Sequence, residues 1–203
     1  MAEKKKNPAQ RFTAAYIKQV QEQHEQDRDK WAFYIGHIVL VFTEIEDLTL
    51  HTIEWFSPPF FEFSKTLLLE KRIDLLATIL DSHGDLSDDV KSEFNSALQK
   101  VKKLAIKRNL IAHNAVKLII TSDSEGIILT AGGVISSARN NEKKMDLRQL
   151  VDFLDEAQDC HVDLYNAKNK ANKQFRNAQY LRHKRERRRL SAAALRNRKS
   201  SAA

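Results

Sequence analysis

Apolar residues recur every three or four positions along several stretches of the chain, which is the spacing of an amphipathic helix. The pattern predicts helices over residues 30–56, 64–82, 87–112 and from residue 146 onward. A more polar helix, rich in Gln and Glu, is expected before these, over residues 8–29. The segment Ser57-Pro58-Pro59 should end the helix before it, because proline disfavours a helical conformation at the residue that precedes it.

Polar residues at the predicted helix starts support these boundaries. Ser87 is a suitable N-cap, and the next two residues, Asp88 and Asp89, place negative charge where the helix dipole favours it. Asp146 is expected to cap the last helix, whose apolar face should end near Tyr165.

Two segments break the helical period. Residues 115–121 and 127–136 are rich in Val, Ile and Thr, and the polar residues 122–126 separate them, as in a β-hairpin. The sequence therefore predicts a mainly α fold: a bundle of four to five helices with a short appended β-hairpin and a basic C-terminal helical extension. Residues 1–29 would form a polar N-terminal helix or arm, residues 30–166 the helical domain and residues 167–203 the basic tail.

The composition narrows the class of protein. Five Gly and three Pro in 203 residues supply too few turns for an all-β fold. The single cysteine, Cys160, excludes an internal disulfide and a Cys-based zinc site and is typical of a reducing cytoplasm. The most apolar window, residues 31–42, is too short to cross a bilayer, and the Lys-rich N-terminus has no apolar stretch behind it. We expect a cytoplasmic protein without a membrane span, metal or cofactor.

Positive charge is concentrated at one end of the chain. Residues 167–203 contain thirteen Lys or Arg and one acidic residue, whereas residues 1–166 contain 21 basic and 26 acidic residues. Such a basic block attracts polyanions by displacing their condensed counterions, although it can also serve only as a solvated helix end. We expect it to contact nucleic acid through Arg182, Lys184, Arg185, Arg187, Arg188 and Arg189.

The clearest chemical signal lies near the end of the helix predicted over residues 87–112. The apolar stripe of this helix consists of Val90, Phe94, Ala97, Val101, Leu104 and Ala105. Arg108 is next in phase, so a permanent charge occupies a position that otherwise faces the core. Burying a guanidinium is unfavourable unless an anion or several acceptors meet it. Asn109 and His113, four residues apart, lie on an adjacent face of the helix.

These three residue types suit phosphodiester chemistry. Arg presents a fork of donors to phosphate oxygens, His can move a proton near neutral pH, and Asn can orient either group. A structural role is equally open: Arg108 would pair with a carboxylate at the edge of the core, while Asn109 and His113 cap the helix end.

The carboxylate partner of Arg108 has three candidates. Glu44 lies on the second predicted helix, and Glu70 and Asp74 lie on the third. His37 and His51 flank Glu44 at intervals of seven residues, about 10.5 Å along a helix, which is too far apart for one metal ion. We expect these three residues to form a polar helix edge. Cys160 and His161 are expected to be packing residues.

The segment from Arg108 to His113 resembles the signature of the HEPN superfamily, the higher eukaryote and prokaryote nucleotide-binding domains. Ribonucleases of that superfamily carry an Arg, a polar residue and then a His after four to six intervening residues, in a small helical bundle. The resemblance covers about residues 31–165. It implies a homodimer whose subunits contribute to one composite site. There His113 would act as general base or acid, Arg108 would stabilise the phosphorane, and Asn109, with the neighbouring Asn114 in support, would position the reacting groups.

The resemblance implies metal-independent RNA cleavage that leaves 2′,3′-cyclic phosphate ends, in a toxin or phage-defence role with an antitoxin or regulatory protein as partner. Many relatives have instead kept the fold as a non-cleaving module. The alternative is therefore a HEPN-like dimerisation or binding module whose basic tail binds nucleic acid or an acidic partner. A further alternative is an RNA-associated accessory protein in which the tail is the functional part.

Overall fold

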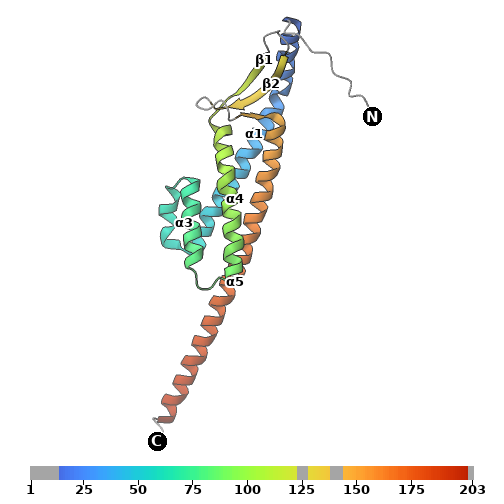
Figure 1. Cartoon of the computed structure of the whole chain (residues 1–203). Helices are drawn as coiled ribbons and strands as arrows, with labels where there is room; N and C mark the ends of the chain where they lie inside the picture. The colour runs from blue at the N-terminus through green and yellow to red at the C-terminus, as the bar shows by residue number, and fades with distance from the viewer. Residues whose placement is uncertain (1–13, 123–127, 138–143, 201–203) are drawn as a thin grey trace, which may run out of the picture. The chain divides into compact units, whose positions relative to one another are not determined.

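The computed structural model describes residues 14–122, 128–137 and 144–200 (Figure 1). These residues form five α-helices, one short 3-10 helix and three β-strands, which confirms the predicted mainly helical fold with a small sheet. The helices are α1 (Ala14–Phe56), α2 (Phe61–Lys65), α3 (Leu69–Ser82), α4 (Asp88–Ala112) and α5 (Leu147–Ser200), and the 3-10 helix is η1 (Pro58–Phe60). Within these ranges, no helix contains a stretch long and apolar enough to span a membrane.

Helix α1 joins the two helices that the sequence predicts over residues 8–29 and 30–56. No glycine or proline stands at their junction, and side chains bridge it: Gln23 and Lys30 both donate to the carboxylate of Asp27, at 3.1 and 2.7 Å. The predicted start at Pro8 lies outside the described residues. The predicted end is confirmed, because α1 stops at Phe56 and Pro58 begins η1.

The helix predicted over residues 64–82 is interrupted. Helix α2 ends at Lys65, and α3 begins only at Leu69. The backbone leaves the helix at Leu68, which has an extended conformation with φ −62° and ψ 152°. The side chain of Arg72 donates to carbonyl oxygens at this junction, to Ser64 at 3.3 Å and to Leu67 at 3.0 Å.

Both later helices begin as the sequence predicts. Ser87 directly precedes α4, and its amide and its hydroxyl both donate to Gln174 Oε1. Asp146 directly precedes α5: its carboxylate accepts a hydrogen bond from the Gln149 amide at 2.8 Å. The Gln149 side chain in turn accepts one from the Asp146 amide at 3.0 Å. This reciprocal pair is a capping box, which confirms Asp146 as the N-cap.

The sheet has one strand more than predicted. Strands β1 (Val116–Ser122), β2 (Ile128–Ser136) and β3 (Lys144–Asp146) pair antiparallel in the order β1-β2-β3. The hairpin of β1 and β2 is confirmed, with Val116 opposite Ile135, while most of its predicted turn lies outside the described residues. Strand β3 spans only three residues, too few for an alternating pattern to be recognised in the sequence.

The chain divides into two compact units, and α1, α4 and α5 contribute to both. The first comprises residues 1–44 and 103–159, and the second residues 45–102 and 160–203. The core of the first contains Trp31, Ile38, Phe42, Leu104, Ile135, Leu150 and Phe153. The core of the second contains Ile45, Ile53, Ile73, Leu76, Leu80, Phe94, Leu98 and Leu164.

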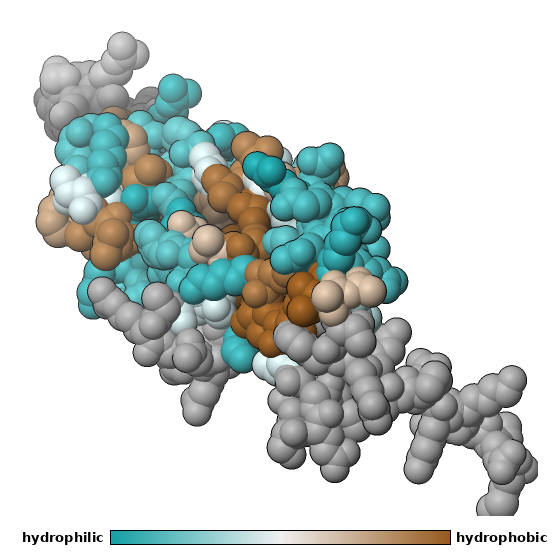
Figure 2. Space-filling view, turned by 90° about the horizontal axis from the view of Figure 1, so that it is seen from above, coloured by the Kyte–Doolittle hydropathy of each residue, from teal (hydrophilic) through white to brown (hydrophobic). Residues whose placement is uncertain are grey.

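The buried face of α5 continues past the predicted end at Tyr165. Tyr165 itself is half exposed, but Ala167 and Ala171 are buried, so the predicted boundary between residues 166 and 167 falls inside this face. Alanines extend this buried face, whereas the predicted end was based on large apolar residues alone. Apolar residues also reach the surface: seen from above, a brown band runs between teal polar areas (Figure 2).

Gly133 on β2 provides a test of packing in the first unit. A methyl group at this position would lie 2.9 Å from His24 Nδ1 and 3.1 Å from Trp31 Nε1. Because Trp31 is buried and its ring is rigid, we expect Gly133→Ala to lower the free energy of unfolding by about 1–3 kcal/mol. Gly84→Ala is the matched control, because no atom lies near its added methyl group. Urea unfolding followed by circular dichroism should separate the two variants, and equal stabilities would contradict this packing.

Candidate functional site

The predicted catalytic residues lie where α4 ends. The backbone amide of His113 donates to the carbonyl of Asn109 at 3.2 Å, and His113 is the first residue after the helix. The Asn114 side chain donates to the Leu110 carbonyl at 2.7 Å and so satisfies one of the last carbonyls of the helix. Asn109 and His113 are both exposed, one helical turn apart, while Asn114 is half-buried.

Arg108 is half-buried, which is less than its phase predicts. The six residues of the predicted stripe are all buried, and so is Ile111, but the Arg108 side chain reaches partly into solvent. Its Nε is shielded from solvent, and its Nη1 donates to Asn109 Oδ1 at 3.4 Å. The structure thus brings Arg108 and Asn109 together at the edge of the core.

Arg108 lies over a buried aromatic ring. Its guanidinium carbon lies 5.9 Å from the centroid of the Phe42 ring, and Phe42 stacks on Phe153 with 6.1 Å between centroids. Lys107 lies 5.5 Å from the centroid of Phe153 and forms an ion pair with Glu156 at 2.7 Å. Two consecutive cations of α4 therefore rest on one pair of buried rings, a favourable cation–π arrangement.

The candidate carboxylates differ in their surroundings. Asp74 accepts a hydrogen bond from Lys102 at 2.7 Å, so Asp74 already has a cation as partner. Glu70 is exposed in the first turn of α3. Glu44 is exposed on α1, two residues after Phe42 and in the same unit as Arg108. Glu44 as a partner of Arg108 stays a prediction.

The remaining histidines and the cysteine have other neighbours. The His37 ring lies against Phe33, with 4.3 Å between centroids, and His51 contacts Glu54 at 3.2 Å. Cys160 is buried, as predicted for a packing residue, and His161 is half-buried. Among the residues that the structure describes, no group of three or more His, Cys, Asp or Glu is placed to hold a metal ion.

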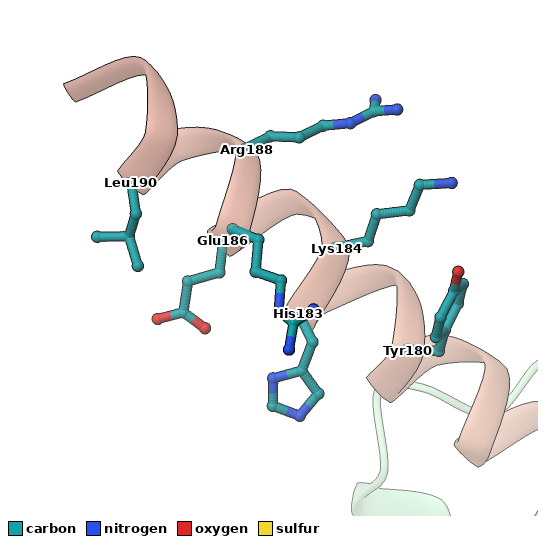
Figure 3. Close-up of a pocket in the computed structure, with 7 residues that line it drawn as sticks. Tyr180, His183, Lys184, Glu186, Arg188 and Leu190 are labelled. Atoms are coloured by element: carbon teal, nitrogen blue, oxygen red, sulfur yellow. The ribbon is translucent and has the colours of Figure 1, made fainter. Parts of the chain in front are cut away.

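The basic end of α5 is exposed from Gln179 to Leu190. Of the six predicted nucleic-acid contacts, Arg182 forms an ion pair with Asp85, which ties this part of α5 to the rest of the second unit. Figure 3 shows Lys184 and Arg188 projecting on one side of the helix and His183, Glu186 and Leu190 on another. The other five predicted contacts, from Lys184 to Arg189, are exposed and so are accessible to a polyanion.

Arg72 is the most deeply buried arginine among the residues whose burial is described, and the sequence pattern did not single it out. Arg72 is only 6% exposed, and besides Ser64 and Leu67 its side chain approaches the Glu46 carbonyl at 3.5 Å. Burial lowers the pKa of Arg72, although Glu46 and Asp47 act in the opposite direction. The helical spacing places Arg72 on the apolar face of α3, because it lies three residues after Leu69 and four before Leu76.

Arg72→Met should be strongly destabilising, because it removes the fork of donors from carbonyl oxygens at the α2–α3 junction. Hydrogen bonds to charged groups contribute about 1.5–3 kcal/mol, and we expect a loss of that size in the free energy of unfolding. The matched control, Arg148→Met, changes an exposed arginine on α5 and should alter stability by less than about 0.5 kcal/mol. Chemical denaturation measures both, and a neutral Arg72→Met would contradict a structural role for this side chain.

Comparison with known proteins adds no family to these observations. No family model, no curated protein and no solved structure matches the chain. The resemblance to the HEPN superfamily therefore stays a prediction, carried by the residues from Arg108 to His113.

Proposed function

We propose that the protein is a HEPN-type endoribonuclease that acts in the cytoplasm without a metal ion. One observation carries this proposal: the end of α4 presents a half-buried arginine, a hydrogen-bonded asparagine and an exposed histidine within six residues. A permanent cation and an imidazole at one helix end are groups that RNA cleavage by an internal nucleophile can use.

Each residue has a defined role in this reaction. The ribose 2′-hydroxyl attacks the adjacent phosphorus, and the bond from phosphorus to the 5′-oxygen breaks, which leaves a 2′,3′-cyclic phosphate. His113 takes the proton of the 2′-hydroxyl or supplies one to the leaving oxygen. Arg108 stabilises the negative charge that develops on the phosphorane oxygens, and Asn109 holds the arginine through its side-chain oxygen.

A second copy of the chain would complete the site. Helix α1 carries an exposed apolar face in the same unit as Arg108, with Phe33 57% and Leu40 60% exposed. Between them, a methyl group added at Gly36 would meet no atom within 4 Å, so there is space for a second helix to approach its backbone closely. A homodimer through this face would bring two α4 ends into one assembly. A toxin or phage-defence role, with an antitoxin as regulator, fits such an enzyme.

The alternative is a non-catalytic module that binds nucleic acid or an acidic partner through α5. The exposed cations between Lys184 and Arg189 favour it, because they need no contribution from the end of α4. Under this alternative, Arg108 would serve only to cover Phe42.

His113→Ala should abolish cleavage of RNA in the presence of EDTA. General acid–base catalysis contributes about 100- to 10,000-fold, so we expect a loss of at least about 100-fold in rate, with fold and dimer intact. Arg108→Ala should lose a similar factor. The assay incubates purified protein with total RNA and identifies the 3′ ends of the fragments as cyclic phosphates.

Gln99→Ala is the control, because it removes an exposed polar side chain of α4 that belongs to neither proposed site, and it should cleave at the parent rate. Equal cleavage by the parent and His113→Ala would refute the assignment of the site. Intact RNA with every variant would favour the binding module.

Substitutions in the basic end of α5 should change the salt dependence of RNA binding. Each phosphate contact of a single strand contributes about 0.7 to the slope of log K against log salt concentration. We expect the pair Arg188→Ala and Arg189→Ala to lower the slope by about 1.4. Arg182→Ala should change it less, because Asp85 already neutralises that arginine. Fluorescence anisotropy with a labelled single-stranded RNA measures the slopes, and equal effects at all three positions would contradict this ranking.

A further inference from the structure

A pocket in the second unit is lined by none of the residues of the proposed cleavage site. It has a volume of about 490 Å³, within the range of about 300–1,000 Å³ that is usual for ligand sites. The end of α1, η1 and the middle of α5 form it, and it is lined by His51, Glu54, Trp55, Pro58, Lys168 and Asn172.

Trp55 is the most informative residue of this pocket. Its side chain is 41% exposed, whereas Trp31, the other tryptophan of the chain, is only 4% exposed. The guanidinium carbon of Arg176 lies 4.8 Å from the centroid of the Trp55 ring. An exposed indole beside a guanidinium offers two flat surfaces, and both stack on nucleobases.

The polar groups of the pocket can contact the phosphate of a nucleotide and the polar edge of its base. Lys168, Asn172 and Arg176 follow one another at intervals of four along α5, so they share one face of the helix. Lys168 and Arg176 provide positive charge for a phosphate, while Glu54, the acidic residue among the lining residues, contacts His51. Asn172 Oδ1 is buried and has no hydrogen-bond partner in the described part of the chain, so it can accept a hydrogen bond from a base.

The same face of α5 continues to the exposed basic end. Gln179, His183 and Arg187 follow Arg176 at intervals of three and four, which keeps them in the same row. Figure 3 shows His183 on this exposed stretch of α5, and Arg187 follows it one turn later. Lys184 lies 6.0 Å from the ring of Tyr180 there, a second pairing of a cation with an exposed aromatic ring. A strand held at Trp55 can therefore extend along α5 over further cations.

We propose that this pocket binds one nucleotide of a single-stranded RNA, with the base stacked on the Trp55–Arg176 pair and its phosphate near Lys168. The choice of RNA over other polyanions rests on the proposed function. Successive nucleotides then follow the row of α5 toward Arg187. An acidic peptide would satisfy the cations, but it has no base to place on the indole.

Tryptophan fluorescence tests the pocket directly, because Trp55 is exposed and Trp31 is buried. The protein used is the full chain with His113→Ala, so that the strand stays uncut. Titration with a twelve-nucleotide oligoadenylate should quench the emission, whereas inorganic polyphosphate, which has charge but no bases, should not. Trp55→Leu should remove the quench and weaken binding about tenfold, in line with about 1–3 kcal/mol for each stacked base.

Phe63→Leu is the matched control, because it removes another exposed aromatic residue of the same unit outside the pocket. Its affinity and quench should equal those of the reference protein. Lys168→Gln, which keeps Trp55, should weaken binding and lessen its salt dependence while the quench at saturation persists. This second variant keeps the test valid if Trp55→Leu fails to fold.

The outcomes separate this pocket from the proposed cleavage. An absent quench, an equal quench by polyphosphate, or unchanged binding by Trp55→Leu would overturn the pocket, whatever the cleavage assay shows. A quench that depends on Trp55 supports the pocket even if the parent protein leaves RNA intact, in which case only the cleavage proposal fails.

Discussion

The contact between two aromatic rings, Phe42 and Phe153, is the interaction on which the first unit and its candidate site depend. The rings lie nearly parallel in the core and join α1 to α5. Both cations at the end of α4, Lys107 and Arg108, lie over this pair. A buried ring pair cannot move without opening a cavity, so it fixes the place of the cations above it. The position of the proposed catalytic arginine is thus set by apolar packing.

Two arginines on apolar helix faces have different surroundings. Arg72 is buried, and its guanidinium donates hydrogen bonds to three backbone carbonyl oxygens of the protein itself. Arg108 is half-buried, and its guanidinium lies over the Phe42 ring. The same residue type in the same phase therefore donates to carbonyl oxygens at a helix junction in one place and lies on an aromatic ring in the other. Phase alone does not distinguish these cases, because the acceptors come from other segments of the chain.

Local sequence signals predicted the fold where the interacting residues lie close together in the sequence. The apolar stripe of α4, the proline break after Phe56 and the cap at Asp146 all involve residues close in sequence. Strand β3 and the buried alanines of α5 depend on distant segments, so their patterns are weak. The break between α2 and α3 lies beside the buried side chain of Arg72, which the hydrophobic pattern did not indicate. For the candidate site, sequence placed Arg108, Asn109 and His113 at one helix end. It gave no indication of Phe42 beneath the arginine or of the exposed Trp55 beside Arg176.

The junction between β3 and α5 has no connecting residue. Asp146 is the last residue of β3, opposite Val134 of β2, and it is also the N-cap of α5. One residue thus takes part in the hydrogen bonding of the sheet and of the helix. A slip of β3 by a single residue would withdraw the carboxylate from the Gln149 amide. Because no linker residue separates β3 from α5, a change in the register of the sheet would also change the first turn of the helix.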